Sequence, residues 1–486
     1  MIDETVRAKY KVVIGLEVHA QMLTASKAYS SDANRYGDAP NTLVSPITLG
    51  HPGTLPVMNE KTIEYAIRLG LACSCHISEH QHFARKNYFY PDLPKGYQIT
   101  QDKTPICTGG QIIIRDEHGN EKPVRLTRIH MEEDAGKSIH DIDVYDTLVD
   151  LNRAGVPLLE IVTEPDIESS QEAYNYVTEV RKLVRYLDIC DGNMEEGSLR
   201  CDANISVMLK DATVYGTKVE VKNMNSIRNV QRAIEAEVKR QIDILEAGGK
   251  IDQETRSFDP VNGTTSTLRS KEDAQDYRYF PEPDLPPVVI SNEQIEQIKA
   301  EMPALPRALY ETYTKSYGLS EYDAMALTAE REIALTYEEI LKHTKNYKAA
   351  CNWLMGPVKA YLNENALEVT ESPFSPEQIV GLIQLVDSGK ISQSTAAEKI
   401  LPELAKSKSA RAENIAQEQN LIQDADEDTI LALAKEILAS WPDKVEAYKN
   451  GNKGMLGLFM GELMKKSGGK ANPKSASALI QKLLES

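Results

Sequence analysis

The pattern of apolar residues changes once along this chain, near residue 291, and this change limits the folds open to it. Before it, short segments such as residues 199–207 alternate apolar and polar side chains, which predicts strands with one face on a core. After it, the spacing is helical, and Ser375-Pro376 followed by Gln378 is a typical helix start with a capping box. Ser291 begins a similar signature.

We therefore predict an α+β protein, with a domain built on a mixed or antiparallel sheet followed by two all-helical modules. The expected domains are residues 1–293, 294–408 and 409–486. Within the first domain, helices are expected near residues 59–71, 170–187 and 226–247.

The composition is that of an ordinary globular protein, with 41% hydrophobic and 26% charged residues among 486. No apolar run reaches the roughly 18 residues of a membrane span, and six scattered cysteines indicate reduced thiols. We expect a cytoplasmic protein that does not enter membranes. The formal net charge of -18 argues against non-specific nucleic-acid binding over the whole surface.

Two carboxylates stand in apolar surroundings within predicted strands. Glu133 continues the apolar row of Ile129 and Met131, and Glu160 has apolar neighbours on both sides. Glu133 is either at a solvated strand end or in a cavity that needs its charge, because an unpaired buried anion is too costly to keep. Both faces of the strand around Glu160 are apolar, so we expect that carboxylate to lie inside. The tail of this first segment, Gly136-Lys137-Ser138, lacks the upstream glycine of a phosphate-binding P-loop, so we reject that motif.

A third strand, over residues 11–20, places Glu17 and His19 on one face. This polar stripe is either a solvated face or a pair of ligands for one ion. His19, Glu133 and Glu160 together suit magnesium first, with phosphate oxygens completing its shell, and zinc or a non-haem metal second. The cations available for nucleotide phosphates are Lys86, Lys137, Arg153, Arg200 and Lys222, so these residue types suit phosphoryl transfer.

Residues 85–97 and 276–284 are rich in aromatic and basic side chains and prolines, and show no period. They suit rigid loops that stack a ring and hold anions, and plain surface connectors explain the composition equally well. From Asp443 onward, eight lysines oppose four carboxylates, which is the reverse of the whole chain. This basic helical tail is either an electrostatic contact for RNA or a solvated face.

Five segments in this order resemble the GatB family, which supplies one of the subunits of bacterial aspartyl/glutamyl-tRNA(Asn/Gln) amidotransferases. They are residues 13–19 (VIGLEVH), 85–92 (RKNYFYPD), 130–138 (HMEEDAGKS), 195–204 (EEGSLRCDAN) and 276–284 (DYRYFPEPD). The likeness extends over nearly the whole chain, including GKANP at 469–473.

The resemblance implies a catalytic cradle domain that uses ATP and Mg²⁺, a helical domain, and a tail that grips tRNA. In this family, ammonia comes from a glutamine amidase subunit, and a small third subunit completes a heterotrimer. The resemblance assigns magnesium to His19, Glu133 and Glu160, and places Glu17, Lys86 and Tyr88 in motifs that line the same pocket. It implies phosphorylation of the side-chain carboxylate of misacylated Glu-tRNA(Gln) or Asp-tRNA(Asn), followed by amidation.

One departure from the family concerns zinc. Many members carry a C-x-C and C-P-x-C knuckle, and those positions read Ser30, Asp32, Ser45 and Thr48 here, so we expect no zinc. Two other hypotheses stay open: a non-catalytic scaffold that presents tRNA to a partner, and a zinc-dependent hydrolase that needs no ATP.

Overall fold

The computed structural model describes residues 3–116, 118–140, 142–270, 277–422, 427–467, 471 and 473–485. It divides into two compact units, Met1–Pro306 and Arg307–Ser486. In the part of the chain that it describes, no helix is long and apolar enough to cross a membrane.

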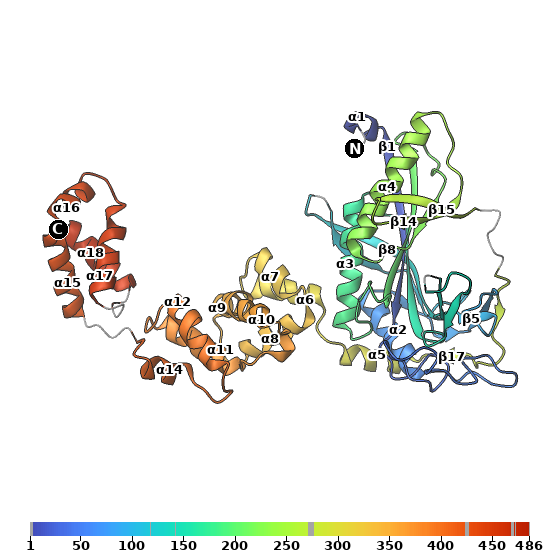
Figure 1. The fold of residues 1–486 in the computed structure, drawn as a ribbon, viewed down its shortest axis with the longest axis horizontal. Coiled ribbons are helices and arrows are strands. Elements are labelled where there is room, and N and C mark those ends of the chain that lie inside the picture. The colour runs from blue at the N-terminus through green and yellow to red at the C-terminus, as the bar shows by residue number, and fades with distance from the viewer. Residues whose placement is uncertain are drawn as a thin grey trace. The chain divides into compact units, whose positions relative to one another are not determined.

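A ten-stranded sheet organises the first unit among the described residues (Figure 1). Its order is β15-β14-β13-β12-β1-β11-β8-β6-β2, with β7 also paired to β8. All pairs are antiparallel except β13 with β14, so the predicted mixed sheet is confirmed. The strands are β1 (Tyr10–Gln21), β2 (His76–Ile77), β6 (Cys107–Thr108), β7 (Gln111–Arg115), β8 (Glu121–Glu133), β11 (Pro157–Thr163), β12 (Leu199–Leu209), β13 (Val219–Lys222), β14 (Glu254–Asp259) and β15 (Thr264–Ser270).

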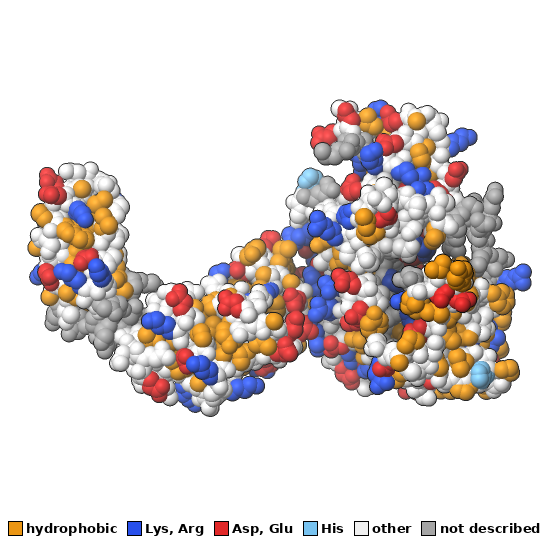
Figure 2. Space-filling view, in the orientation of Figure 1, with side chains coloured by type: hydrophobic (Ala, Val, Ile, Leu, Met, Phe, Trp, Pro, Cys, Tyr) orange, Lys and Arg blue, Asp and Glu red, His pale blue; other side chains and the backbone are white. Residues whose placement is uncertain are grey.

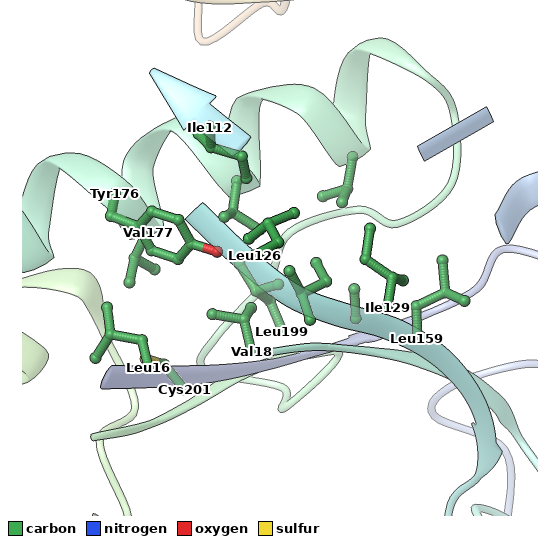
Figure 3. Packing of buried hydrophobic residues seen from close by; sticks show 14 of the residues in the cluster. Leu16, Val18, Ile112, Leu126, Ile129, Leu159, Tyr176, Val177, Leu199 and Cys201 are labelled. Atoms are coloured by element: carbon green, nitrogen blue, oxygen red, sulfur yellow. The ribbon is translucent and has the colours of Figure 1, made fainter. Parts of the chain in front are cut away.

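Helices cover one face of this sheet and bury its apolar side chains. They are α2 (Glu60–Ala72), α3 (Ser170–Tyr186) and α4 (Ile227–Glu246), close to the predicted ranges. The side chains of Ser169 and Ser226 cap α3 and α4. In Figure 3, Tyr176 and Val177 of α3 lie over Leu16 and Val18 of β1 and their neighbours on β8, β11 and β12. The opposite, polar face of the central strands is thereby left for a site.

Smaller sheets flank the large one. The three-stranded sheet runs β16 (Phe280–Pro281), β4 (Ala84–Asn87) and β5 (Tyr97–Thr100), and two-stranded pairs join β9 (Lys137–Ile139) to β10 (Leu148–Asp150) and β3 (His80–Gln81) to β17 (Val288–Val289). The segment expected to be an irregular loop at 85–97 thus includes strand residues at both ends, because backbone pairing with the distant β16 orders it. Asp276 of its partner motif lies outside the described residues.

The second unit is helical throughout its described part, as predicted. One hydrophobic cluster runs from Tyr313 to Ala416, and another from Ile430 to Leu484. The helices of the first cluster are α6 (Pro306–Glu311), α7 (Glu321–Leu327), α8 (Arg331–Leu341), α9 (Tyr347–Trp353), α10 (Lys359–Glu364), α11 (Pro376–Asp387), α12 (Gln393–Thr395), α13 (Leu401–Leu404) and α14 (Ala412–Glu418), with short π-helical turns between some of them. Those of the second are α15 (Glu427–Ser440), α16 (Pro442–Lys449), α17 (Met455–Lys466) and α18 (Pro473–Glu485).

Both helix-start signals are present. The side chain of Ser375 accepts from the backbone nitrogen of Gln378, whose own side chain accepts from the backbone of Ser375, which completes the capping box of α11. Ser291 caps α5 (Asn292–Glu301), and Ile298 of α5 is buried in the core of the first unit. The two compact units divide after Pro306, and the predicted domain limits at 293 and 408 stay predictions.

Candidate active site

Four neighbouring strands bring polar side chains into one row on the face of the sheet opposite α3 and α4. The antiparallel register places Arg200 of β12 beside His19 of β1, His19 beside Glu160 of β11, and Glu160 beside His130 of β8. His19 Nε2 lies 3.4 Å and His130 Nε2 3.3 Å from Glu160 Oε2. One carboxylate is therefore held between two imidazoles.

The two imidazoles determine the charge of Glu160. Burial opposes ionisation of this carboxyl, yet His130 and His19 outweigh it and hold the pKa of Glu160 well below its usual range. Burial likewise opposes the charged form of His130, whereas Glu160 and Glu132 raise the pKa of its imidazole to about 8. The pKa of His19 is also raised, since its hydrogen bond to Glu160 overcomes the effect of burial. The two imidazoles and the carboxylate of Glu160 thus stabilise one another's charged forms.

Glu132 joins this row from the end of β8. Its Oε2 lies 3.9 Å from His130 Nε2 and accepts a hydrogen bond of 2.9 Å from Thr100 Oγ1. Ligand atoms of His130, Glu132 and Glu160 all lie within 4.8 Å of one another. His130 Nδ1 is buried and has no hydrogen-bond partner in the part of the chain that the structure describes. Two carboxylates and an imidazole this close fit a divalent cation, which would replace the imidazolium as their counter-charge.

A second acidic group lies on the same polar face. Ligand atoms of Glu17, Asp202 and Glu220 also approach within 4.8 Å of one another. Burial and the charges of Glu160 and Asp202 raise the pKa of Glu17, and its Oε1 accepts from Asn204 Nδ2 at 2.9 Å. Lys222 Nζ lies 3.0 Å from Glu220 and contacts Asp202 as well. This group could take a second cation, with Lys222 as its present counter-charge.

Glu133 is not brought to His19 and Glu160. Successive side chains of β8 point to opposite faces, so Glu133 leaves the row that Glu132 joins. Its carboxylate instead contacts Lys95 Nζ and accepts a hydrogen bond of 2.8 Å from the backbone nitrogen of Ile99. Glu132, and not Glu133, therefore lies beside Glu160 in the structure. The buried carboxylate of Glu133 is paired with Lys95 instead.

Lys86 and Tyr88 approach the row from the three-stranded sheet. Lys86 Nζ lies 3.5 Å from Glu132 Oε1, and although burial lowers the pKa of Lys86, Glu132 and Glu160 raise it well above its usual value. Tyr88 donates to Gln98 Oε1 at 2.6 Å, and Gln98 Nε2 donates to the backbone oxygen of Glu133 at 2.7 Å. Lys86 thus belongs to the site directly, whereas Tyr88 is tied to it through Gln98.

The remaining predicted cations differ in position. Arg200 Nη1 lies 2.8 Å from Asp134 Oδ2, and its charge helps to hold the pKa of Asp134 at about 2 against the effect of burial. Arg153 donates to the backbone oxygens of Ala135 and Gly136 at 2.9 and 2.7 Å. Lys137 is exposed on β9. Arg200 and Lys222 therefore flank the row, whereas Arg153 orders the loop after β8.

The chain is similar to known proteins over nearly its whole length. The family model described as the GatB/GatE catalytic domain matches residues 12–296, and the one described as the GatB domain matches residues 335–484. The chain is 48% identical over 477 residues to the B subunit of an aspartyl/glutamyl-tRNA(Asn/Gln) amidotransferase from Thermodesulfovibrio yellowstonii, and this covers 98% of the chain and 100% of the relative.

The chain belongs to the GatB family.

Other relatives of the same name are equally similar. That of Chlorobium luteolum is 48% identical over 477 residues, covering 98% of this chain and all of the relative. That of Geobacter sulfurreducens is 48% identical over 480 residues, covering 98% and 99%. The similarity includes the whole polar face of the sheet, so the site described above lies in the matched GatB catalytic domain.

Sequence reasoning missed four members of the site: His130, Glu132, Asp202 and Glu220. The alternation of β8 already grouped Arg128, His130 and Glu132 on one face, but only the register shows that this face is the one with Glu160. Asp202 and Glu220 lie on the polar faces of alternating strands, and alternation alone does not distinguish a solvated face from a site. Their pairing with β1 and β12 was the missing information.

Proposed function

We propose that this chain carries the ATP-dependent step of tRNA-dependent amidation, as part of an enzyme that ligates nitrogen to carbon with glutamine as the amide donor. Its substrate is Glu-tRNA(Gln), Asp-tRNA(Asn) or both. The observation that carries the proposal is the row of His19, Glu160 and His130 with Glu132 and Lys86 beside it, in a domain that matches the catalytic model of the family.

The substrate's carboxylate is a poor electrophile and must be activated before ammonia can react with it. ATP bound with Mg²⁺ supplies a phosphoryl group that converts this carboxylate into an acyl phosphate, from which ammonia displaces inorganic phosphate. Glu132 and Glu160 would hold the divalent cation, with His19 and His130 as imidazole donors or as clamps on Glu160. Glu17, Asp202 and Glu220 would hold a second one.

The cations of the site have separate tasks in this proposal. Arg200, held by Asp134, and Lys222 would bind phosphate oxygens, since both lie on the polar face next to the carboxylates. Lys86 remains charged next to Glu132 and orients the anionic side chain of the substrate. Burial of His130 and Glu132 would limit the access of water to this part of the site, where an acyl phosphate needs protection from hydrolysis.

The proposal includes three partners. A glutamine amidase subunit provides ammonia, a small third subunit completes the heterotrimer, and the basic helices α16 to α18 bind tRNA. Lysines at 444, 449, 453, 465, 466 and 482 lie on or next to these helices, whereas Lys470 and the side chain of Lys474 lie outside the described residues. A chain of net charge -18 needs such a local basic surface to approach a polyanion.

The test measures phosphate release from ATP by the assembled complex with Glu-tRNA(Gln), with ammonium supplied so that the amidase is not needed. Glu160→Gln should abolish both ATP hydrolysis and amide formation while tRNA binding persists. The control Glu168→Ala, at an exposed ion pair with Lys11, should leave both intact. Full activity of Glu160→Gln would show that the chain is a tRNA-presenting scaffold.

A further inference from the structure

Four tyrosine rings form a continuous row beside the candidate active site. Ring centroids are separated by 6.1 Å for Tyr90 and Tyr88, 5.9 Å for Tyr88 and Tyr277, and 6.1 Å for Tyr277 and Tyr279, and each pair meets edge to face. We call these four residues the tyrosine row. Its members come from segments almost 190 residues apart in sequence, so only the fold assembles it.

Backbone contacts fix the two halves of the row to each other. Strand β16 pairs with β4, and the backbone nitrogen of Asn87 donates to the carbonyl oxygen of Tyr277 at 2.9 Å. The side chain of Asn87 donates to the carbonyl oxygen of Arg278, also at 2.9 Å. The rings are therefore held in a defined arrangement on strand ends.

The outer members of this region are exposed to an extent that a core role does not explain. Phe89 is 87% and Tyr90 57% exposed, and Tyr279 and Phe280 are 44% and 45% exposed. Figure 2 shows hydrophobic side chains gathered on the first unit near β5, with acidic side chains beside them. A gathering of exposed rings on one surface indicates a binding site.

A hollow of about 390 Å³ lies at the Tyr90 end of the tyrosine row. It is lined by Phe89, Tyr90, Pro91, Leu93, Pro94 and Lys95, among others. Aromatic and proline walls suit the flat ring of a base.

The third ring of the row, Tyr277, lies next to Lys86 of the candidate active site. Lys86 Nζ lies 5.2 Å from the centroid of Tyr277 and 3.5 Å from Glu132 Oε1. A ligand that follows the rings from the hollow inward thus arrives at the carboxylates of the candidate active site.

We propose that the tyrosine row and Phe89 stack the unpaired 3′-terminal bases of the acylated tRNA. This inference rests on the proposed function, because the amino acid is esterified to the terminal ribose and the preceding bases must lie next to the site. Stacking on aromatic rings holds single-stranded nucleotides without reading their sequence, which suits a terminus shared by different tRNAs. The occupant is thus a single strand with its acylated end at Lys86.

The experiment compares Phe89→Ala/Tyr90→Ala with wild type in the complete complex, at saturating ATP and ammonium. The KM for Glu-tRNA(Gln) should rise about tenfold or more for each lost stack, with kcat nearly unchanged. Both residues are exposed, so the fold should tolerate the change. The matched control is Tyr215→Ala, at an exposed tyrosine (65%) between β12 and β13, and should keep the wild-type KM.

A direct readout uses tRNA with 2-aminopurine in place of the base that precedes the terminal adenine. Its fluorescence should be quenched on binding to wild type and to Tyr90→Phe, and much less on binding to Tyr90→Leu, which keeps an apolar side chain without a ring. Acylated adenosine, which lacks the preceding bases, should react equally well with wild type and the double variant.

Two results would overturn the inference. One is that the double variant keeps the wild-type KM for Glu-tRNA(Gln) and the wild-type fluorescence quenching while the wild-type complex is active. The other is that the double variant loses as much activity on acylated adenosine as it does on Glu-tRNA(Gln). Failure of the proposed function is a different observation, namely that wild type itself releases no phosphate from ATP. The fluorescence comparison still tests stacking in that case.

Discussion

The sharpest prediction compares two adjacent carboxylates under the same substitution. Glu132→Gln should abolish cation binding at the row, whereas Glu133→Gln should leave it nearly unchanged and destabilise the protein. The difference follows from strand alternation, which directs Glu132 to His130 and Glu160 and Glu133 to Lys95.

The magnitudes follow from the contacts of each residue. The side chains of Glu133 and Lys95 are only 3% and 12% exposed, and removing one partner of a buried pair costs about 3–5 kcal/mol. In the variant, Lys95 Nζ would still lie 5.4 Å and 6.0 Å from the ring centroids of Tyr97 and Tyr29. These cation–π contacts should offset about 1 kcal/mol of the loss in stability. We therefore expect Glu133→Gln to lower the free energy of unfolding by about 2–4 kcal/mol.

Glu132→Gln should differ from Glu133→Gln in its effect on the cation. It loses a buried ion pair with Lys86 and the contact with His130, and losing the repulsion from Glu160 offsets only part of this, so stability should also fall by about 2–4 kcal/mol. Since loss of residues that merely orient a ligand costs about 10–100-fold in metal affinity, loss of a ligand should cost about 100-fold or more.

The assay pairs calorimetric titration with Mn²⁺ and amide hydrogen exchange of β8 and β11. Hydrogen exchange is needed because both tryptophans, Trp353 and Trp441, lie in the second unit and do not report on the first. Loss of Mn²⁺ binding in Glu133→Gln together with normal binding in Glu132→Gln would refute the geometric argument.

Three further predictions concern other parts of the chain. Asp32 Oδ2 accepts hydrogen bonds from Ser30 Oγ, Thr48 Oγ1 and the backbone nitrogen of Ser45. Asp32→Ala should therefore lower the free energy of unfolding by about 1.5–3 kcal/mol in denaturant titrations. A change no larger than that of Asp211→Ala, at an exposed carboxylate, would contradict this. Burial lowers the pKa of Lys27 from 10.5 to about 8, so the unfolded chain keeps this proton to a higher pH than the folded chain. The free energy of unfolding should therefore rise between about pH 8 and 10.5, and Lys27→Met should remove this rise. Exchanging lysines 444 and 453 for glutamate should weaken tRNA binding and flatten its salt dependence in filter-binding titrations, whereas unchanged affinity would remove the tail from the tRNA contact.

Several features of the site could be predicted from local patterns alone. The strand over β1 and the polar row of Glu17 and His19 follow from alternation, and Glu160 stands out because apolar residues surround it. Lys86 was predicted from an aromatic and basic segment, and the structure places it next to Glu132.

The choice between Glu132 and Glu133 could not be made in this way. Both are buried, at 5% and 2% exposed, so polarity and burial do not separate them. What separates them is the partner on each side: β11 brings Glu160 to one face, and the loop before β5 brings Lys95 to the other.

The sequence by itself therefore determined the class of the fold, the helix caps, the strands and the helical second half, because these depend on residues close together in the chain. The tertiary structure alone decided which polar face becomes a site, that His130 and Glu132 join Glu160, and that two distant aromatic segments form one row of rings. The physical reason is that strand register and sheet order pair residues more than a hundred positions apart, and no local periodicity contains that information.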